Sequence, residues 1–179
     1  MLGKDTLEYL LGHYQFDTVL DLGCGQGEQS EIFRVADKDV TALSLEKEYE
    51  RAVVGDYNTT HFADKFDCIW CCHVLEHQDN VGLFLEKLFD DTADGGVLAI
   101  TAPPFRTDLR YDLRDDHVSV WTRGLLLYNL VRAGWDCADA HVQKYGYNIS
   151  VIVKKNPTQL NTQCLKDAIE HFPKGYDFL

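Results

Sequence analysis

The feature that most constrains the fold of this chain is a glycine-rich turn between a strand-like run and a helix-like run. The turn, residues 21–27, reads DLGCGQG, with an apolar run at 18–21 before it and a helix-like pattern at 28–35 after it. Glycine adopts positive φ at little cost and lets a ligand approach the main chain closely. The first N–H groups of the following helix also lack partners within that helix. Such a turn indicates a ligand site in an α/β fold.

The spacing of the glycines argues against a diphosphate ligand. A dinucleotide site shows the pattern G-x-G-x-x-G, which seats a pyrophosphate on the helix N-terminus. Here the glycines occupy positions 23, 25 and 27, and Glu28 stands where the third glycine would be. Because its carboxylate would repel a pyrophosphate, we expect a ligand without phosphate, and nicotinamide-dependent oxidoreduction is disfavoured.

Apolar runs of strand length alternate with helix-like segments along the chain. Strands are expected at residues 18–21, 40–45, 52–54, 66–71, 97–101, 135–142 and 148–153. Helices are expected at residues 6–14, at 28–35, from Asp79 or Asn80 onward, and at 122–133. This order predicts an α/β fold: a doubly wound, mostly parallel seven-stranded sheet with helices on both faces and the last strands antiparallel. Between the second and third strands there is room for a helix of one or two turns only.

The ends and faces of the later helices have recognisable signals. Asp79 is a candidate N-cap, and the apolar positions of the helix that follows are expected to share one face: Leu83, Phe84, Leu88 and Phe89. Thr122 is placed to cap the next helix, and Gly134 to end it.

The length of 179 residues fits a single domain. We assign residues 1–155 to that domain and residues 156–179 to a polar C-terminal tail, in which 160–171 has the pattern of a short helix. Residues 105–120 hold many charges and little periodicity. Since a segment this long inside a compact domain is usually functional, it is the candidate lid.

Charge and cysteine usage exclude several classes of function. The net charge of −12 opposes nucleic-acid and anionic-membrane binding and favours a small or neutral partner. The six cysteines include one C-x-x-C pair, Cys68 and Cys71, within a buried-type strand, so we expect reduced core thiols and no metal site. No signal peptide or membrane span is expected, which favours a cytoplasmic protein. The oligomeric state stays open.

Three segments, in matching order and spacing, carry a resemblance to a known family. Residues 19–27 (VLDLGCGQG), 66–77 (FDCIWCCHVLEH) and 94–98 (DGGVL) are similar to motif I, the strand-four segment and the turn before strand five of the class I S-adenosylmethionine-dependent methyltransferases. The resemblance covers roughly residues 16–154 and implies S-adenosyl-L-methionine as the cofactor. That molecule has a nucleoside, an amino acid and a sulfonium cation but no phosphate, which agrees with Glu28 in the turn.

The resemblance implies that the cofactor lies over the glycine-rich turn. The main chain would pass beneath its methionine and ribose portions at Gly23, Cys24, Gly25 and Gly27. Asp21 would hold the turn or the ammonium group of the cofactor through hydrogen bonds.

Further cofactor contacts are implied at the ends of the second, third and fourth strands. Family members often carry an acid at the end of strand two for the ribose hydroxyls, but Ser44 stands there, so our candidate is Glu46 on the same face, with a solvated surface charge as the alternative. Asp56 is the candidate for the adenine amino group, with the main-chain N–H of Tyr57 beside the ring, and a plain turn as the alternative. Main-chain carbonyls near Cys72 could receive the ammonium group.

Two histidines are candidates for a general base. His73 follows the fourth strand, and His117 ends the candidate lid next to two acidic residues. For each, a structural hydrogen-bonding role is an equal alternative, whereas Glu76 and His77 are expected to pack and cap the adjoining helix. The lid arginines could clamp an anionic acceptor or pair with nearby aspartates: Arg106, Arg110 and Arg114.

We therefore expect transfer of a methyl group from S-adenosylmethionine to a small-molecule or glycan acceptor, with oxygen favoured over nitrogen. The Asn/Asp-Pro-Pro-aromatic signature of base-modifying amino-methyltransferases is absent after strand four. The alternative is a catalytically degenerate cofactor-binding module within a larger assembly, suggested by the missing acid of strand two and the short third strand.

Overall fold

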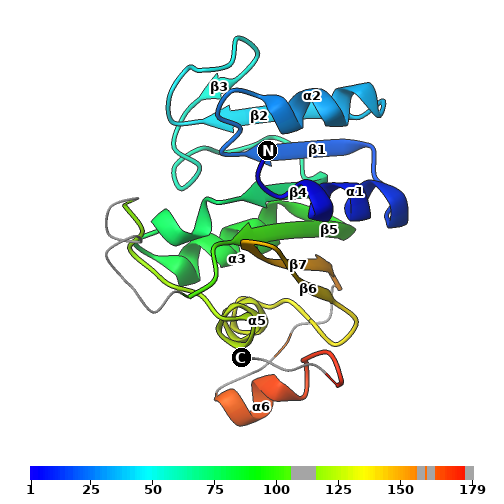
Figure 1. The fold of residues 1–179 in the computed structure, drawn as a ribbon, viewed down its shortest axis with the longest axis vertical. Helices are drawn as coiled ribbons and strands as arrows, with labels where there is room; N and C mark the ends of the chain where they lie inside the picture. The colour runs from blue at the N-terminus through cyan, green and yellow to red at the C-terminus, as the bar shows by residue number, and fades with distance from the viewer. Residues whose placement is uncertain (106–115, 157–159, 161–163, 176–179) are drawn as a thin grey trace.

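The structure, a computed structural model, describes residues 1–105, 116–156, 160 and 164–175. At its centre is a seven-stranded sheet in the order β3-β2-β1-β4-β5-β7-β6, with β3 at the top in Figure 1 and β6 toward the bottom. The strands are β1 (Thr18–Leu22), β2 (Asp39–Ser44), β3 (Val53–Val54), β4 (Phe66–Cys72), β5 (Thr92–Ala102), β6 (His141–Tyr145) and β7 (Asn148–Lys154). The predicted seven-stranded α/β sheet is confirmed.

Strand directions follow the prediction as well. β1 pairs in parallel with β2 on one side and with β4 on the other, and β4 pairs in parallel with β5. β7 runs antiparallel to both β5 and β6. The order of strands reverses at β1, and the parallel register places Leu22 opposite Cys71, so both strands end at the same edge of the sheet. Ligands of open α/β sheets bind at such a switch point.

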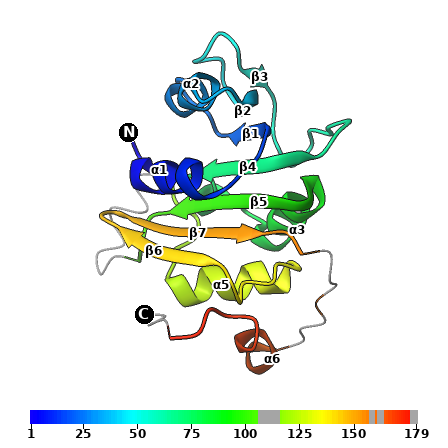
Figure 2. The same cartoon turned by 90° about the vertical axis from the view of Figure 1, so that its right-hand side faces the viewer.

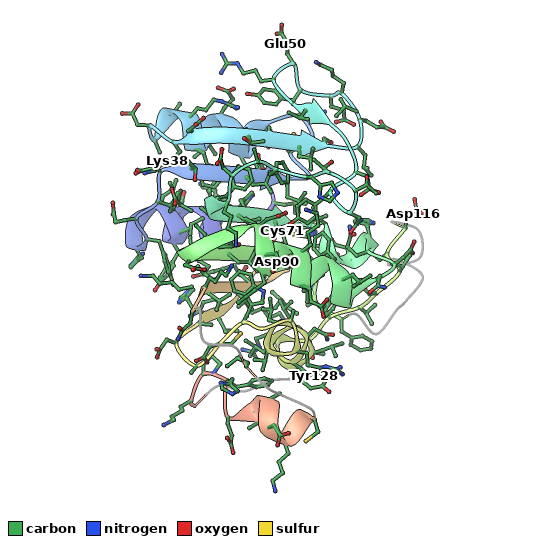
Figure 3. The ribbon with its side chains drawn as sticks, turned by 180° about the vertical axis from the view of Figure 1, so that it is seen from behind. Lys38, Glu50, Cys71, Asp90, Asp116 and Tyr128 are labelled. Carbon is green, nitrogen blue, oxygen red and sulfur yellow. The ribbon has the colours of Figure 1, made fainter. Side chains whose placement is uncertain are left out.

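Helices cover both faces of the sheet. Helices α1 (Lys4–His13) and α2 (Glu28–Val35) bury Leu7, Leu10 and Phe33 against one face. The short 3-10 helix η1 (Leu75–His77), α3 (Val81–Asp91) and α5 (Arg123–Arg132) pack against the other. Figures 1 and 3 show α1 in front of the sheet and α3 behind it, with Cys71 near the middle of the molecule. Each strand of the sheet centre is therefore buried on both sides, which explains its continuous apolar runs.

Two details of α3 differ from the sequence expectation. The N-cap is Asn80 and not Asp79, because the side chain of Asn80 accepts a hydrogen bond from the Leu83 N–H at 3.2 Å. Leu83 is 63% exposed, and Leu85 takes its place in the core beside Phe84. With the helix beginning at Val81, the buried stripe is set by its contact with α5 and β5.

Two strand boundaries and one predicted helix also differ. β5 begins at Thr92 and runs through both glycines of the predicted turn, which hydrogen-bond to the end of β7: Gly95 N–H donates to Lys155 O at 3.1 Å, and Lys155 N–H donates to Gly96 O at 2.7 Å. β6 begins only at His141, since Asp136 accepts a hydrogen bond from Ala138 N–H and bends the chain before the strand. No helix is found between β2 and β3, where residues 45–52 are all described.

Thr122 caps α5 as expected, accepting from Leu125 N–H at 3.1 Å, and Gly134 follows the helix with φ of 103°. Just before this helix, Pro104 and Trp121 form an isolated parallel bridge, with Phe105 N–H donating to Trp121 O at 2.6 Å. The candidate lid starts and ends near this bridge. Its residues 106–115, with Arg106, Arg110 and Arg114, lie outside the described residues.

In the C-terminal tail, α6 (Leu165–Ile169) is shorter than the predicted 160–171 and contacts α5. Ala168 and Phe172 are buried in the same apolar cluster as α3 and α5. Figures 1 and 2 place α6 at the end of the molecule opposite β3. Among the described helices, none has the length and apolar character needed to cross a bilayer.

The cap of α3 gives a stability prediction. Asn80→Ala is expected to lower the free energy of unfolding by about 0.5–2 kcal/mol, since it removes the partner of an N–H group at the helix start. Urea unfolding of the variant measures the change, and Asp79→Ala is the matched control, for which we expect almost none. A larger loss in Asp79→Ala than in Asn80→Ala would contradict this cap assignment.

Candidate functional site

The glycine-rich turn lies at the switch point between β1 and α2. Gly23, Gly25 and Gly27 have φ of 75°, 48° and 81°, in the region that favours glycine. A Cβ on Gly23 would overlap the Val74 side chain, and one on Gly27 would lie 2.5 Å from the ring of Tyr49. Two of the three glycines are therefore required by neighbouring side chains as well as by their backbone angles.

An open cavity of about 230 Å³ adjoins this turn. Its lining comes from the ends of β1 and β2, the turn after β3 and the segment after β4: Leu22, Gly23, Leu43, Ser44, Leu45, Gly55, Asp56, Tyr57, Asn58, His73, Val74, His77 and Gln78. A second groove of about 460 Å³ lies on the other side of the turn and includes Cys24, Glu28 and Cys72. Because Gly23 and His73 line both, the two spaces meet at these residues. Neither lining contains a lysine or an arginine among the described residues.

Asp21 lies beneath the turn and lines neither space. Its side chain is fully buried, and Oδ2 accepts a hydrogen bond from the Ser30 hydroxyl at 2.5 Å. Burial raises the pKa of Asp21 to about 6, although the Ser30 hydrogen bond and the charge of Arg34 oppose the shift. The structure therefore gives Asp21 the role of tying β1 to α2 under the turn.

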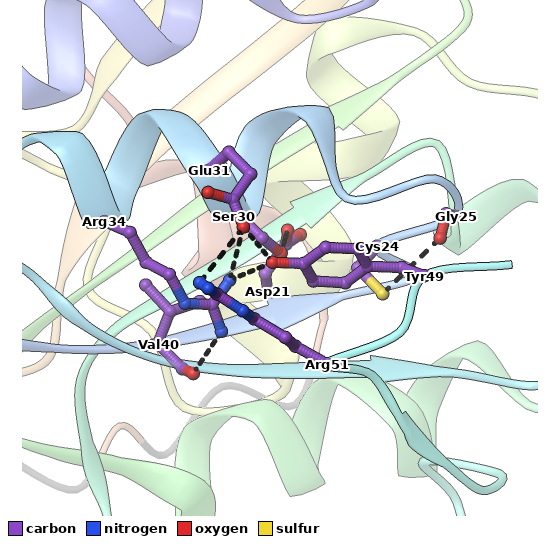
Figure 4. A network of polar contacts seen from close by, with 9 residues as sticks. All are labelled: Asp21, Cys24, Gly25, Ser30, Glu31, Arg34, Val40, Tyr49 and Arg51. Carbon is purple, nitrogen blue, oxygen red and sulfur yellow. Dashed lines mark hydrogen bonds and ion pairs between the residues drawn. The ribbon is translucent and has the colours of Figure 1, made fainter. Parts of the chain in front are cut away.

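A polar network fixes the connection between β2 and β3 against α2, as Figure 4 shows. The Tyr49 hydroxyl donates to Glu31, and Arg34 donates to Tyr49 Oη at 2.6 Å and to Val40 O at 2.9 Å. Arg51 lies 3.4 Å from the same Glu31 carboxylate. The ring of Tyr49 is thereby held against Gly27 at the start of α2.

The candidates after β2 and β3 differ in position. Asp56 lines the cavity, and its Oδ1 accepts from the N–H of Asn58 at 2.9 Å. Tyr57 is buried, its hydroxyl donates to Asp91 Oδ2 at 2.9 Å, and burial raises its pKa, so its side chain belongs to the core. Glu46 is exposed and is not among the lining residues, whereas Ser44 is.

The two cysteine candidates line the second groove but have little reactivity of their own. Burial raises the pKa of both Cys24 and Cys72 to about 11. The sulfur of Cys72 accepts hydrogen bonds from the Thr101 hydroxyl at 3.2 Å and from the Gln29 amide at 3.6 Å. Both thiols are thus neutral at physiological pH.

His73 is held on both sides of its ring. It has φ of 56°, which is unusual for a residue other than glycine. Its Nδ1 lies 3.0 Å from Glu76 Oε1, and its Nε2 lies 2.5 Å from Asn148 Oδ1. Burial lowers the pKa of His73, but the hydrogen bonds to Glu76 and Asn148 and the charge of Glu76 outweigh it, so the net shift is upward. Both ring nitrogens face oxygens that accept hydrogen bonds, and while both carry protons neither accepts a further one.

His117 lies beside His77, with the two ring centroids 5.0 Å apart. The segment that carries it is attached to η1, because Val118 N–H donates to the main-chain oxygen of Glu76 at 2.9 Å and Asp116 O accepts from His77 Nδ1 at 3.1 Å. Figure 3 shows Asp116 on the side toward which the β1 and β2 arrows point. The structure thus brings His117 to Glu76 and His77, a proximity that the sequence analysis did not predict.

Comparison with known proteins gives a consistent answer. A family model described as a methyltransferase domain matches residues 3–140. The chain is similar to malonyl-[acyl-carrier protein] O-methyltransferase of Salmonella typhimurium, with 32% identity over 108 residues, or 54% of this chain. The match covers 43% of the length of that relative, so the chain spans less than half of it.

Solved structures share the fold. One is a Burkholderia thailandensis 1,6-didemethyltoxoflavin-N1-methyltransferase with bound S-adenosylhomocysteine, with a TM-score of 0.69, 18% identity, and coverage of 86% of this chain and 76% of that one. Another is the N-methyltransferase NodS of Bradyrhizobium japonicum, with a TM-score of 0.67, 16% identity, and coverage of 86% and 85%.

The buried Asp21 carboxyl gives a pH-dependent stability prediction. Its pKa in the folded state, about 6, lies above the ordinary 3.8, so the stability it contributes is present below about pH 4 and is lost as the pH rises through 6. Relative to the wild type, Asp21→Asn is therefore expected to gain on the order of 2–3 kcal/mol between pH 4 and pH 7. Urea unfolding across this range measures the difference. Asp39→Asn, at an exposed position of β2, is the control, and a difference for Asp21→Asn that stays constant with pH would refute the assignment.

Proposed function

This chain belongs to the class I S-adenosylmethionine-dependent methyltransferase family, and we propose that it transfers a methyl group from S-adenosyl-L-methionine to a small-molecule or glycan acceptor. The observation that carries the proposal is the pair of spaces that meet at Gly23 and His73. Their described linings contain the carboxylates of Asp56 and Glu28, the ring of His73 and otherwise neutral side chains, with no lysine or arginine. Such a surface suits a cationic nucleoside without phosphate and does not suit a dinucleotide.

In this proposal the nucleoside occupies the cavity that contains Asp56. The free oxygen of the Asp56 carboxylate accepts from the adenine amino group, and the main-chain N–H of Tyr57 faces the ring. Ser44 lines the space where the ribose hydroxyls would lie. Glu46 stays a proposed ribose partner, although it would have to turn inward from its exposed position.

The methionine portion extends across the glycine-rich turn into the second groove. The main chain of Gly23, Cys24, Gly25 and Gly27 passes beneath it, and the main-chain carbonyls near Cys72 receive its ammonium group. Asp21 supports this arrangement from below, because its carboxylate holds the turn against α2 and adds negative charge near the sulfonium. With these assignments, the residues of the turn form the surface on which the cofactor binds.

We propose oxygen as the atom that is methylated. S-adenosylmethionine supplies a methyl group bound to a positively charged sulfur. The acceptor oxygen forms a bond to this carbon as the carbon–sulfur bond breaks, and the hydroxyl proton leaves to a base. The similarity to an O-methyltransferase that acts on a malonyl-[acyl-carrier protein] supports oxygen. Alignment of the acceptor and removal of water provide most of the rate acceleration of such a displacement.

His73 and His117 are the proposed bases. His73 lies where the two spaces meet, but its ring is held by Glu76 and Asn148, so it can take a proton only after releasing one of its own. Because both ring nitrogens of His73 are engaged, and because Ser44 stands at the end of β2 in place of an acid, a second candidate function is favoured: a module that binds the cofactor without catalysing methyl transfer.

We propose that residues 1–155 make up the methyltransferase domain, with the tail 156–179 covering α5 through Ala168 and Phe172. The six cysteines are free, and five are buried, which favours a reducing compartment such as the cytoplasm.

Calorimetric titration with S-adenosylmethionine tests the cofactor assignment. We expect binding to the wild type, none of comparable strength for NAD, and an affinity loss of about 1–3 kcal/mol in Asp56→Ala, because the hydrogen bond to the adenine amino group is removed. Glu46→Ala in the same titration decides whether that carboxylate contacts the ribose. Glu50→Ala, an exposed acid at the far end of the molecule in Figure 3, is the matched control. Absence of binding heat when S-adenosylmethionine is added to the wild type would refute the proposed function.

Turnover tests the catalytic assignment. Formation of S-adenosylhomocysteine is measured with a panel of hydroxyl and amine acceptors, and hydroxyl acceptors are expected to be used. His117→Ala is expected to slow turnover by about 10²-fold or more without weakening cofactor binding, as for loss of a general base. An unaltered rate would show that His117 is not the general base. Binding of the cofactor without turnover of any acceptor would favour the module.

A further inference from the structure

Three side chains with metal-ligating atoms converge beside the proposed cofactor site. One ligand atom each from Glu76, His77 and His117 lies within 4.8 Å of the other two. Glu76 and His77 belong to η1, and His117 comes from a segment 40 positions along the chain that hydrogen-bonds to η1. Ligands of one tetrahedral metal at about 2.0–2.1 Å are separated by about 3.4 Å. A shift of roughly an ångström would therefore close the cluster on an ion.

The Glu76 carboxylate is the independent sign of a ligand. Its side chain is completely buried, its Oε1 lies 3.0 Å from His73 Nδ1, and its Oε2 has no hydrogen-bond partner among the described residues. An ionised carboxylate in such surroundings is costly unless it is paired or bound to a metal. Its one described ion-pair partner is His73, which leaves Oε2 for a second cation.

The ring of His77 is oriented for ligation. Its Nδ1 lies 3.1 Å from the carbonyl oxygen of Asp116, and a carbonyl can only accept, so Nδ1 carries the proton. In the neutral ring the lone pair then lies on Nε2. Ligating histidines typically donate their other N–H to a carbonyl in this way, which fixes both tautomer and orientation.

We propose that Glu76, His77 and His117 form a binding site for one divalent transition-metal cation of the zinc class. Two imidazoles and one carboxylate are a known zinc donor set that keeps a fourth position open, whereas Mg²⁺ prefers oxygen ligands alone. His77 is exposed and lines the cavity at Gly23, so the open position lies toward that cavity. The site can take a hydroxyl or carboxylate oxygen of a small ligand there.

This inference goes beyond the proposed function, since metal binding requires no methyl donor. In the metal-free protein His117 keeps its proposed role as a base, whereas with the metal bound it is a ligand and His73 is a positioning residue that holds Glu76. The expectation of no metal site came from cysteine spacing, and the cluster contains no cysteine.

Calorimetric titration of EDTA-stripped protein with ZnCl₂, in the absence of S-adenosylmethionine, tests the site. All proteins in this test, including the reference called wild type, carry Cys164→Ser, because this exposed thiol could bind zinc elsewhere. We expect one equivalent of Zn²⁺ bound per chain, and at least a tenfold weaker affinity in His77→Ala, in His117→Ala and in Glu76→Gln. The matched control is His61→Ala, which removes an exposed imidazole outside the cluster and is expected to leave the affinity unchanged. MgCl₂ should give no saturable heat.

A second readout does not depend on the Glu76→Gln variant, because a substitution at this buried position can prevent folding. His77 is exposed, so His77→Ala is expected to fold, and circular dichroism of the metal-free protein checks this. At the same concentration, Zn²⁺ should raise the melting temperature of the wild type more than that of His77→Ala. The proposal is overturned by absence of saturable Zn²⁺ binding to the wild type, or by unchanged affinity in both histidine variants. Loss of S-adenosylmethionine binding would leave this result untouched, so the two proposals fail separately.

Discussion

The parallel pairing of β1 with β4 is the constraint on which the rest of the structure depends. Its register sets Leu22 opposite Cys71, so both strands stop at one edge, and the turn at Gly23 meets the segment at His73 and Val74. The hydrogen bonds of this ladder are buried between two helical layers, where an unmade bond would leave costly unpaired groups. A slip by one residue would turn Asp21 toward the opposite face and away from Ser30.

The polar groups at this edge hold one another in place across elements far apart in sequence. Glu76 contacts His73 with its side chain, and its main-chain oxygen accepts from Val118, so a single residue connects β4, η1 and the chain before α5. Asn148 at the start of β7 closes the other side of the His73 ring. The positive φ of His73 is maintained by these contacts, in keeping with strained residues at functional sites.

What the sequence predicted well was decided by local chemistry. The glycine turn, the Thr122 cap and the seven strands follow from residue types and periodicity, which act over a few positions. The packing of α3 determines that Asn80 and not Asp79 is its N-cap. It also places Leu85 in the core instead of Leu83. The approach of His117 to Glu76 is a tertiary contact, and nothing in the local pattern specifies it.

The bridge between Pro104 and Trp121 has a consequence for how this fold can diversify. The two ends of the intervening stretch are fixed to each other, and the end at Val118 is also fixed to η1, so the sheet and the glycine turn do not depend on how many residues lie between them. For loops in general, doubling the length costs only about 0.6 kcal/mol in closure entropy. Relatives could therefore acquire new acceptor preferences by lengthening or rewriting that stretch, while the part of the molecule that receives the methyl donor stays as it is.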